Sequence, residues 1–253
     1  MGGLISKLKK TDNSTLPSIT KCKDGYSWWA SFEFYPLATG KSKTAFEAMM
    51  YIPNDFWSKT RSVVKVCNGG TGKEDLLRPE IRTSEIADDY WNKFRKYQSD
   101  CPVPKLEIVR PLLAALDCVS ILNPVFRFFK QYDKRLEEGE FVLLEPYIEG
   151  EFTSFIYSYG VVSSSCPDFL QAFCHFSYFE SNGEFVISNL QGTSSEKKIV
   201  LSLPCIHSRD RSFGERDMGE KGMLDFFTHH RCSSICANWP KPISDGPVID
   251  SIR

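Results

Sequence analysis

A short cluster of histidine and cysteine near the C-terminus constrains the fold of this chain more than any other feature. The segment 230–236 reads His-Arg-Cys-Ser-Ser-Ile-Cys and places one imidazole and two thiols close together. Such a cluster suits a tetrahedral zinc ion, which then needs one further ligand. Of the 4 histidines in the chain, His175 lies on a phenylalanine-rich segment that is predicted to be helical, and it is our candidate for the fourth ligand. The alternative is that Cys232 and Cys236 are buried apolar side chains without a metal.

Four protein ligands would close such a site and leave no open position for water or substrate. We therefore expect this zinc to be structural and to hold the C-terminal part of the chain together. The remaining thiols agree with this interpretation, because the chain has 9 cysteines, an odd number, with no compact spacing pattern and no secretory signal. Free thiols and a metal site fit that pattern better than a disulfide framework.

The charge balance argues against one class of protein. Lys and Arg together number 31 against 32 Asp and Glu, which gives a net charge of -1. A dedicated nucleic-acid binder needs a strongly basic surface, so we expect no nucleic-acid partner. The sequence also lacks an uncharged apolar run of about 18 residues, so no membrane-spanning helix is expected.

Hydrophobic periodicity and turn residues predict a mixed α+β chain. The second half of the chain begins near Gly150, and 204–213 is expected to be irregular. The expected strands cover 26–35, 45–52, 62–67, 141–148 and 184–189. The expected helices cover 79–98, 167–179 and 219–229.

The N-terminus carries a lipidation motif. The chain begins Met-Gly-Gly-Leu-Ile-Ser, which fits the pattern for myristoylation of Gly2 once the initiator methionine is removed. Lys7, Lys9 and Lys10 follow and would attract anionic lipid, the second signal that a single acyl chain requires. We expect 1–17 to form an acylated, basic tail and linker at the cytoplasmic face of a membrane. The alternative is an unmodified N-terminus, since small residues after the first methionine are common.

Several motifs in order resemble those of the alpha-kinase family, a group of atypical protein kinases. The strongest stretch reads Gln-Ala-Phe-Cys-His-Phe-Ser-Tyr at 171–178, and Leu-Gln-Gly follows at 190–192. Pro-Cys-Ile-His-Ser at 204–208 and Gly-Glu-Lys-Gly at 219–222 come next, before the histidine–cysteine cluster. The resemblance covers roughly 36–239, and an ordered set of motifs is far more specific than any one alone.

The resemblance implies a two-lobed kinase fold with the nucleotide between the lobes. On this basis an alpha-kinase-like domain spans 18–253, with an N-lobe over about 18–145 and a C-lobe over about 150–253. The family carries a structural zinc in the C-terminal lobe, bound by two histidines and two cysteines. Carried over to this chain, the metal ligands are His175, His230, Cys232 and Cys236.

The resemblance also implies contacts to ATP. The segment 36–46 resembles the loop that covers the phosphates, and Lys65 resembles the strand lysine that contacts them. Glu85 is our candidate for a helix carboxylate that pairs with this lysine. Asp75 would lie near the terminal phosphate, and the hinge residues would meet adenine. The implied nucleotide-binding set is Gly40, Lys43, Lys65, Asp75, Glu145 and Tyr147.

The catalytic positions depart from the family pattern. Asn189 stands where the family has an Asp, although Gln191, a metal-coordinating position, is retained. Leu203 replaces a second catalytic Asp, and Arg216 fills the central glycine of a glycine-rich loop. An amide lacks the negative charge that helps to hold Mg²⁺, and leucine can neither accept a proton nor hydrogen-bond a substrate hydroxyl.

Three hypotheses follow. We favour a membrane-tethered, ATP-binding pseudokinase or signalling scaffold with weak Mg²⁺ binding. The second hypothesis is an active protein serine/threonine kinase that transfers the γ-phosphate of ATP with a rearranged metal site, in which Asp217, Glu215 or Asp75 supplies the carboxylate. The third is a scaffold that binds no nucleotide. The retention of four residues argues against it, namely Lys65, Asp75, Glu145 and Gln191. A protein is expected as substrate or signalling partner.

Overall fold

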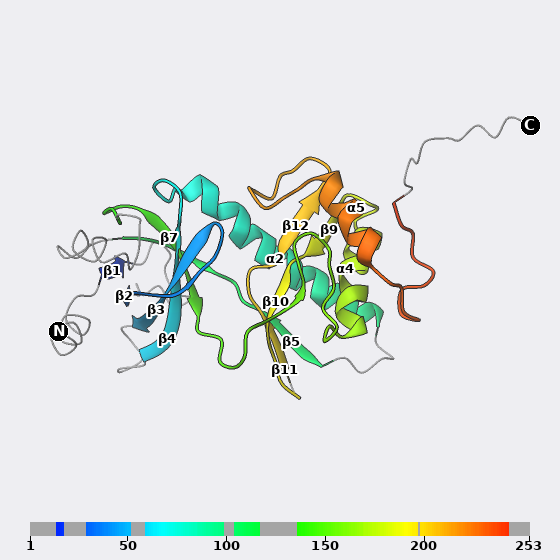
Figure 1. Cartoon of the computed structure of the whole chain (residues 1–253), viewed down its shortest axis with the longest axis horizontal. Coiled ribbons are helices and arrows are strands. Elements are labelled where there is room, and N and C mark those ends of the chain that lie inside the picture. The colour runs from blue at the N-terminus through cyan, green and yellow to red at the C-terminus, as the bar shows by residue number, and fades with distance from the viewer. Residues whose placement is uncertain are drawn as a thin grey trace, which may run out of the picture. The chain divides into compact units, whose positions relative to one another are not determined.

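The structure is a computed structural model that describes 14–17, 29–51, 59–98, 104–116, 136–196 and 198–242 (Figure 1). The predicted lipid anchor, Gly2 with Lys7, Lys9 and Lys10, lies outside the described residues. The chain divides into two compact units. The first unit comprises 1–81 with 109–149, and the second comprises 82–108 with 150–253.

A six-stranded antiparallel sheet forms the scaffold of the first unit. Its strands lie in the order β1-β2-β3-β4-β7-β6, and every neighbouring pair is antiparallel. β4 lies inside the sheet and pairs Lys65 with Ala45 of β3 and with Leu143 of β7. The strand bounds are β1 (Ser14–Pro17), β2 (Trp29–Thr39), β3 (Lys43–Tyr51), β4 (Lys59–Cys67), β6 (Leu112–Ala115) and β7 (Phe141–Pro146).

Buried and partly exposed residues alternate along β3, and this pattern identifies the buried face of the sheet. Thr44, Phe46 and Ala48 are buried, and the residues between them are partly exposed. Side chains with a period of two share one face of a strand, so a register shift of one residue would expose them. The buried face therefore fixes the register of β3. Its core partners on the neighbouring strands include Val64, Val66, Val142 and Leu144.

The boundary between the units falls within the long helix α2 (Glu74–Tyr97). Acidic residues in its first turn and basic residues in its last turn complement the helix dipole. The helix begins at Glu74 and not at 79 as predicted. Pro79 lies inside the helix and does not occupy its first position. Trp91 and Phe94 are buried on its apolar side.

Among the described residues, the second unit comprises two smaller sheets, the helices α4 and α5, and the part of α2 from Arg82 onward. The four-stranded sheet has the order β5-β11-β10-β8, in which β5 and β11 are parallel and the other pairs antiparallel. The two-stranded sheet pairs β9 with β12. The bounds are β5 (Lys105–Ile108), β8 (Thr153–Ile156), α4 (Asp168–Glu180), β9 (Phe185–Ser188), β10 (Leu190–Ser194), β11 (Lys198–Leu201), β12 (Cys205–Ser208) and α5 (Glu220–His229).

The helix α4 lies in the core of the second unit. An unbroken run of its residues is buried, from Ala172 to Tyr178, as expected for a helix enclosed within a domain. Its buried hydroxyl, Ser177, donates to the carbonyl of Cys174 at 2.6 Å and accepts from the N–H of Ile187 at 2.8 Å. The second bond attaches α4 to β9 and so helps to fix the rotation of the helix that carries the predicted metal ligand.

Most of the predicted elements are confirmed, with errors among the short strands. The segment 204–213, predicted to be irregular, contains β12, whose four residues are all buried and therefore show no alternation. The strands β1, β5, β6, β8, β10 and β11 were not predicted either, and each has only four or five residues. The prediction that 1–17 is a tail and linker is wrong at its end, because Ser14–Pro17 is β1 and pairs with β2 in the sheet. Within the described residues, no helix combines the length and the apolar character needed to cross a membrane.

Candidate metal centre and catalytic positions

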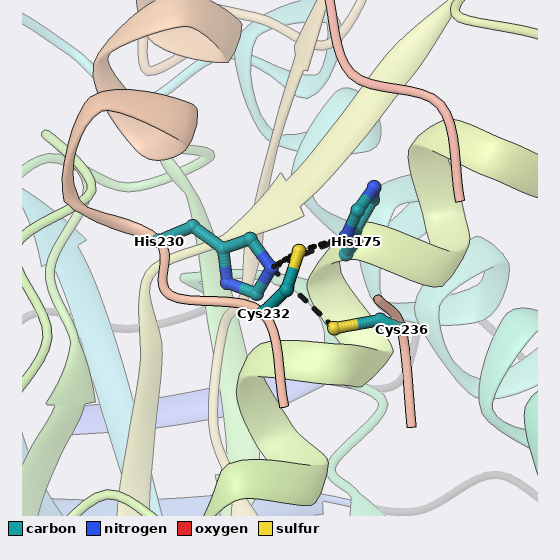
Figure 2. Close-up of side chains that lie close together, drawn as sticks. All are labelled: His175, His230, Cys232 and Cys236. Carbon is teal, nitrogen blue, oxygen red and sulfur yellow. Dashed lines mark hydrogen bonds between the residues drawn. The ribbon is translucent and has the colours of Figure 1, made fainter. Parts of the chain in front are cut away.

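Four potential metal ligands from two distant parts of the sequence converge in the second unit (Figure 2). His175 comes from α4, and His230, Cys232 and Cys236 come from the segment that follows α5. Their ligand atoms all lie within 4.8 Å of one another. The structure therefore brings together the four residues that the sequence predicted.

The separations fit a tetrahedral ion. His175 Nδ1 lies 3.1 Å from His230 Nε2. Cys232 Sγ lies 3.5 Å from His230 Nε2 and 3.7 Å from His175 Nδ1, and Cys236 Sγ lies 3.6 Å from His230 Nε2. Bond lengths of about 2.0–2.1 Å for Zn–N and about 2.3 Å for Zn–S place tetrahedral ligands about 3.3–3.8 Å apart. These four separations match that spacing to within a few tenths of an ångström, and all four ligand atoms lie within 4.8 Å of one another.

Neighbouring groups orient both histidines. His175 Nε2 lies 2.9 Å from the carbonyl oxygen of Pro240, and because a carbonyl only accepts, the proton is on Nε2 and the Nδ1 lone pair faces the cluster. His230 caps the C-terminus of α5 with extended backbone, φ −71° and ψ 128°, which ends the helix there. Its ring stacks on Phe226 with 5.0 Å between centroids.

Burial favours the neutral forms of these side chains. It lowers the pKa of His230 to about 4, with His175 adding to the effect, and it also lowers the pKa of His175. Burial raises the pKa of the Cys236 thiol to about 11. Neutral imidazole is the form that binds a metal, whereas a thiol must lose its proton, which a bound cation favours.

In the first unit, two of the predicted nucleotide-binding residues pair with each other. Lys65 Nζ on β4 lies 2.8 Å from Glu145 Oε2 on β7. The Glu145 side chain is only 2% exposed, so this ion pair lies largely out of water. Asp75 is exposed in the first turn of α2, and Glu85 is exposed further along the helix.

The other predicted nucleotide-binding residues of the first unit flank a turn and the end of a strand. Gly40 and Lys43 bracket the turn between β2 and β3, and the Lys43 ammonium forms an ion pair with Glu80 of α2. Tyr147 follows β7, and the Arg61 guanidinium lies 3.6 Å from the centroid of its ring.

In the second unit, the residues at the predicted catalytic positions are hydrogen-bonded to one another. Asn189 Nδ2 donates to the carbonyl oxygen of Leu203 at 3.1 Å. Arg216 Nη1 donates to the same oxygen at 3.1 Å, and Nη2 donates to the carbonyl of Pro204 at 3.1 Å. Asn189 and Leu203 have left-handed backbone, with φ 54° and 44°. Asn and Asp adopt this conformation readily and Leu does not, so Leu203 occupies backbone better suited to a carboxylate residue.

A protein-family model described as the alpha-kinase family matches residues 38–236. The chain belongs to the alpha-kinase family. Among curated relatives, myosin heavy chain kinase B of Dictyostelium discoideum is 25% identical over 92% of this chain and 31% of its own length. Myosin heavy chain kinase A of the same organism is 35% identical over 69% of this chain and 14% of its own length. This chain thus spans less than a third of the length of either relative.

Solved structures agree with the family and establish the α+β fold of an alpha-kinase domain. An alpha kinase from Entamoeba histolytica has a TM-score of 0.68 at 21% identity, covering 91% of this chain and 92% of that one. The alpha-kinase domain of myosin-II heavy chain kinase A in complex with AMP-PNP has a TM-score of 0.68 at 20% identity, covering 90% and 95%. The predicted family and its α+β fold are confirmed.

A buried carboxylate organises the loop before α5 in this alpha-kinase domain. Asp217 Oδ1 accepts from the N–H groups of Ser208 at 2.8 Å and Gly219 at 2.9 Å. Its Oδ2 accepts from the Ser208 hydroxyl at 2.5 Å and the Phe213 N–H at 3.3 Å. A carboxylate engaged by four donors is part of the scaffold, which weakens the hypothesis that Asp217 substitutes for a lost metal ligand. Glu215 is exposed.

Sequence reasoning missed several residues that shape these sites. The carbonyl of Pro240 orients His175, and Glu80 pairs with Lys43. The bridging bonds of Arg216 depend on the path of the backbone, so no sequence pattern marks them. Asn68 hydrogen-bonds to the turn between β2 and β3. One sequence feature could have identified it, namely its position in a glycine-rich loop directly after a predicted strand.

Proposed function

We propose that this chain is an ATP-binding alpha-kinase domain whose phosphotransfer is strongly impaired. The observation that carries the proposal is the hydrogen bond from the Asn189 amide to the carbonyl of Leu203. Because a carbonyl can only accept, the amide nitrogen must face it, and Asn189 acts as a donor at this position. A magnesium site requires oxygen ligands, usually with negative charge, and neither Asn189 nor Leu203 supplies a carboxylate.

The size of the expected defect follows from the chemistry. Phosphoryl transfer depends on positioning and on neutralising the charge of the triphosphate, largely through Mg²⁺. A positioned acid or base contributes about 10²–10⁴-fold to a rate, and Leu203 cannot take that role. With Asn189 also neutral, little transfer should remain.

Nucleotide binding is proposed to persist. Lys65 retains the ammonium that a kinase places against the phosphates, and Glu145 holds it in place across β4 and β7. Gln191 is retained and can offer a neutral oxygen to a weakly held Mg²⁺. The alpha-kinase domain of myosin heavy chain kinase A, 20% identical, has been solved with ADP and with AMP-PNP, and binding by this chain is inferred by similarity.

We further propose that His175, His230, Cys232 and Cys236 hold one zinc ion. The support is the fit of their separations to tetrahedral ligand spacing and the tautomer that Pro240 imposes on His175. An ion with four protein ligands has no open position, so it would join α4 to the segment after α5 and would not act on a substrate.

Membrane association completes the proposal. The support is the sequence alone, namely the motif at Gly2 and the nearby Lys7, Lys9 and Lys10. The alpha-kinase domain would then act at the cytoplasmic face of a membrane on a protein substrate or partner.

An active protein serine/threonine kinase is the second candidate. It is favoured by the names of the relatives, which are kinases, and by the retained Gln191. Asp75, exposed at the start of α2, is the carboxylate of the first unit that the family resemblance places near the terminal phosphate.

Calorimetric titration with ATP, with and without Mg²⁺, tests the proposed function. We expect weak binding that Mg²⁺ changes little, and weaker binding by Lys65→Ala. Lys198→Ala, which removes a lysine paired with Glu107 on the surface, is the matched control and should bind like the wild type. Absence of binding at millimolar ATP would favour a scaffold without nucleotide, and strong enhancement by Mg²⁺ would favour the active kinase.

A further inference from the structure

The turn between β2 and β3 is held from outside by one asparagine. Gly40 N–H donates to the Lys43 carbonyl at 2.8 Å and closes the turn. Gly40, Lys41 and Ser42 are exposed, so few packing contacts hold this backbone in one conformation. Asn68, the residue directly after β4, holds the turn through hydrogen bonds instead.

Asn68 uses both ends of its side-chain amide on this turn. Nδ2 donates to the carbonyl of Gly40 at 2.7 Å and to that of Lys41 at 3.3 Å. Oδ1 accepts from the hydroxyl of Thr44 at 2.7 Å. The backbone N–H of Asn68 donates to the carbonyl of Ser42 at 2.8 Å. Three successive carbonyls are thus directed to one residue.

The direction of these carbonyls sets the direction of the amide groups. In a trans peptide the C=O and the following N–H point in opposite directions. Because the Gly40 and Lys41 carbonyls face Asn68, the N–H groups of Lys41 and Ser42 point away from it. Successive N–H groups that point the same way on a turn form a concavity that favours an anion.

A second contact anchors the end of the same turn. The Lys43 ammonium pairs with Glu80 of α2, and both side chains are largely buried, at 13% and 11% exposure. Lys41 is exposed at the tip of the turn and adds positive charge beside the two N–H groups. An anionic ligand on this turn would therefore meet N–H groups whose orientation depends on Asn68.

We propose that Asn68 is a positioning residue that holds the 40–43 turn in the conformation that binds the phosphates of the nucleotide. This inference rests on the proposed ATP binding and adds the residue that orients the turn. Asn68 itself would not contact the phosphates, because its side-chain amide is already hydrogen-bonded to backbone carbonyls and to Thr44.

The test compares two ligands that differ only in their phosphates. Calorimetry should find that Asn68→Ala weakens ATP binding by about tenfold, corresponding to two lost backbone hydrogen bonds, while adenosine binds as it does to the wild type. Asn92→Ala, on the exposed side of α2, is the control and should change neither affinity. An equal loss for ATP and adenosine would reduce Asn68 to a general structural role and overturn the proposal, as would an unchanged ATP affinity.

Hydrogen exchange separates this inference from the proposed function. In nucleotide-free protein, Asn68→Ala should speed exchange of the Gly40 amide while amides at the centre of β4 keep their wild-type rates. If the wild type binds no ATP, the proposed function and this inference both fail, whatever the exchange result. If the wild type binds ATP and the Asn68→Ala turn exchanges no faster, only the inference fails.

Discussion

Arg216 donates to the backbone carbonyls of Leu203, a predicted catalytic position, and of the next residue, Pro204. Its planar fork reaches the carbonyls of Leu203 and Pro204 at 3.1 Å each, and both of those residues are buried. A buried carbonyl that loses its hydrogen-bond donor cannot bond to water instead, so the loss destabilises the folded state. The residue that fills a glycine of the family loop is therefore part of the scaffold of the second unit.

Replacing this arginine should measurably destabilise the chain. Arg216→Ala is expected to lower the free energy of unfolding by about 2–3 kcal/mol, since two hydrogen bonds to a charged donor are lost. Arg216→Lys should recover only part of this, because an ammonium cannot reproduce the planar fork. Urea denaturation measures the difference, with the exposed Lys221→Ala as control. Equal stabilities of Arg216→Ala and Lys221→Ala would contradict the bridging role.

If zinc is bound, the stability of the chain should depend on the metal. Cys232→Ala should lower the free energy of unfolding by several kcal/mol in zinc-containing buffer, because such metal binding is coupled to folding. After chelation, the wild type should fall to nearly the stability of the variant. Cys166→Ala removes a partly buried thiol outside the cluster and serves as control. Purified wild-type protein that contains no zinc would refute the prediction.

At the scale of elements, the long segments could be predicted and most of the short strands could not, with β9 (Phe185–Ser188) as an exception. Periodicity located β3 and α5 because each has a buried face long enough to repeat. The spacing of Phe169, Phe173 and Phe176 located α4, although the helix is buried on nearly all sides. β12 has four buried residues in succession, and such a run carries no period. The helix α2 began earlier than predicted because Pro79 was taken as a start signal, and the acidic residues before it were the better one.

A glycine in the loop before α2 is predicted to be essential for packing. A Cβ at Gly72 would lie 2.1 Å from the backbone oxygen of Phe141, and the Gly72 N–H donates to buried Glu140 at 3.0 Å. Backbone cannot yield as a flexible side chain does, so Gly72→Ala should cost about 2 kcal/mol or more. At Gly69 a Cβ meets nothing within 4 Å, so Gly69→Ala should be nearly neutral. Similar denaturation midpoints for the two variants would contradict this packing.

At the scale of the whole molecule, the cluster of two histidines and two cysteines was predictable, and the hydrogen bonds around Asn189 and Leu203 were not. Three ligands lie within seven consecutive residues, and His175 was the one remaining histidine placed on an apolar helix. The sequence also marked Asn189 and Leu203 as substitutions. Their hydrogen bond, and that of Arg216 to the same carbonyl, arise from left-handed backbone and a loop path that only the folded chain defines.

Membrane association is predicted from the N-terminal sequence. In cells that contain N-myristoyltransferase, Gly2→Ala should move the protein from the membrane fraction to the soluble fraction, since it removes the acylated residue. Replacing Lys7, Lys9 and Lys10 by Gln should weaken binding by about 1 kcal/mol per charge, in a salt-sensitive manner. Fractionation with immunoblotting measures both. A wild-type protein found wholly in the soluble fraction would contradict the prediction.

The central claim is that ATP binds but its phosphate is hardly transferred. The most direct measurement is the turnover number for transfer of the γ-phosphate from labelled ATP with Mg²⁺ to a generic serine/threonine substrate protein. The account predicts turnover at least about 10²-fold below the range of about 1–100 s⁻¹ typical of kinases. Wild-type turnover within that range would contradict the account and establish the chain as an active kinase with a rearranged metal site.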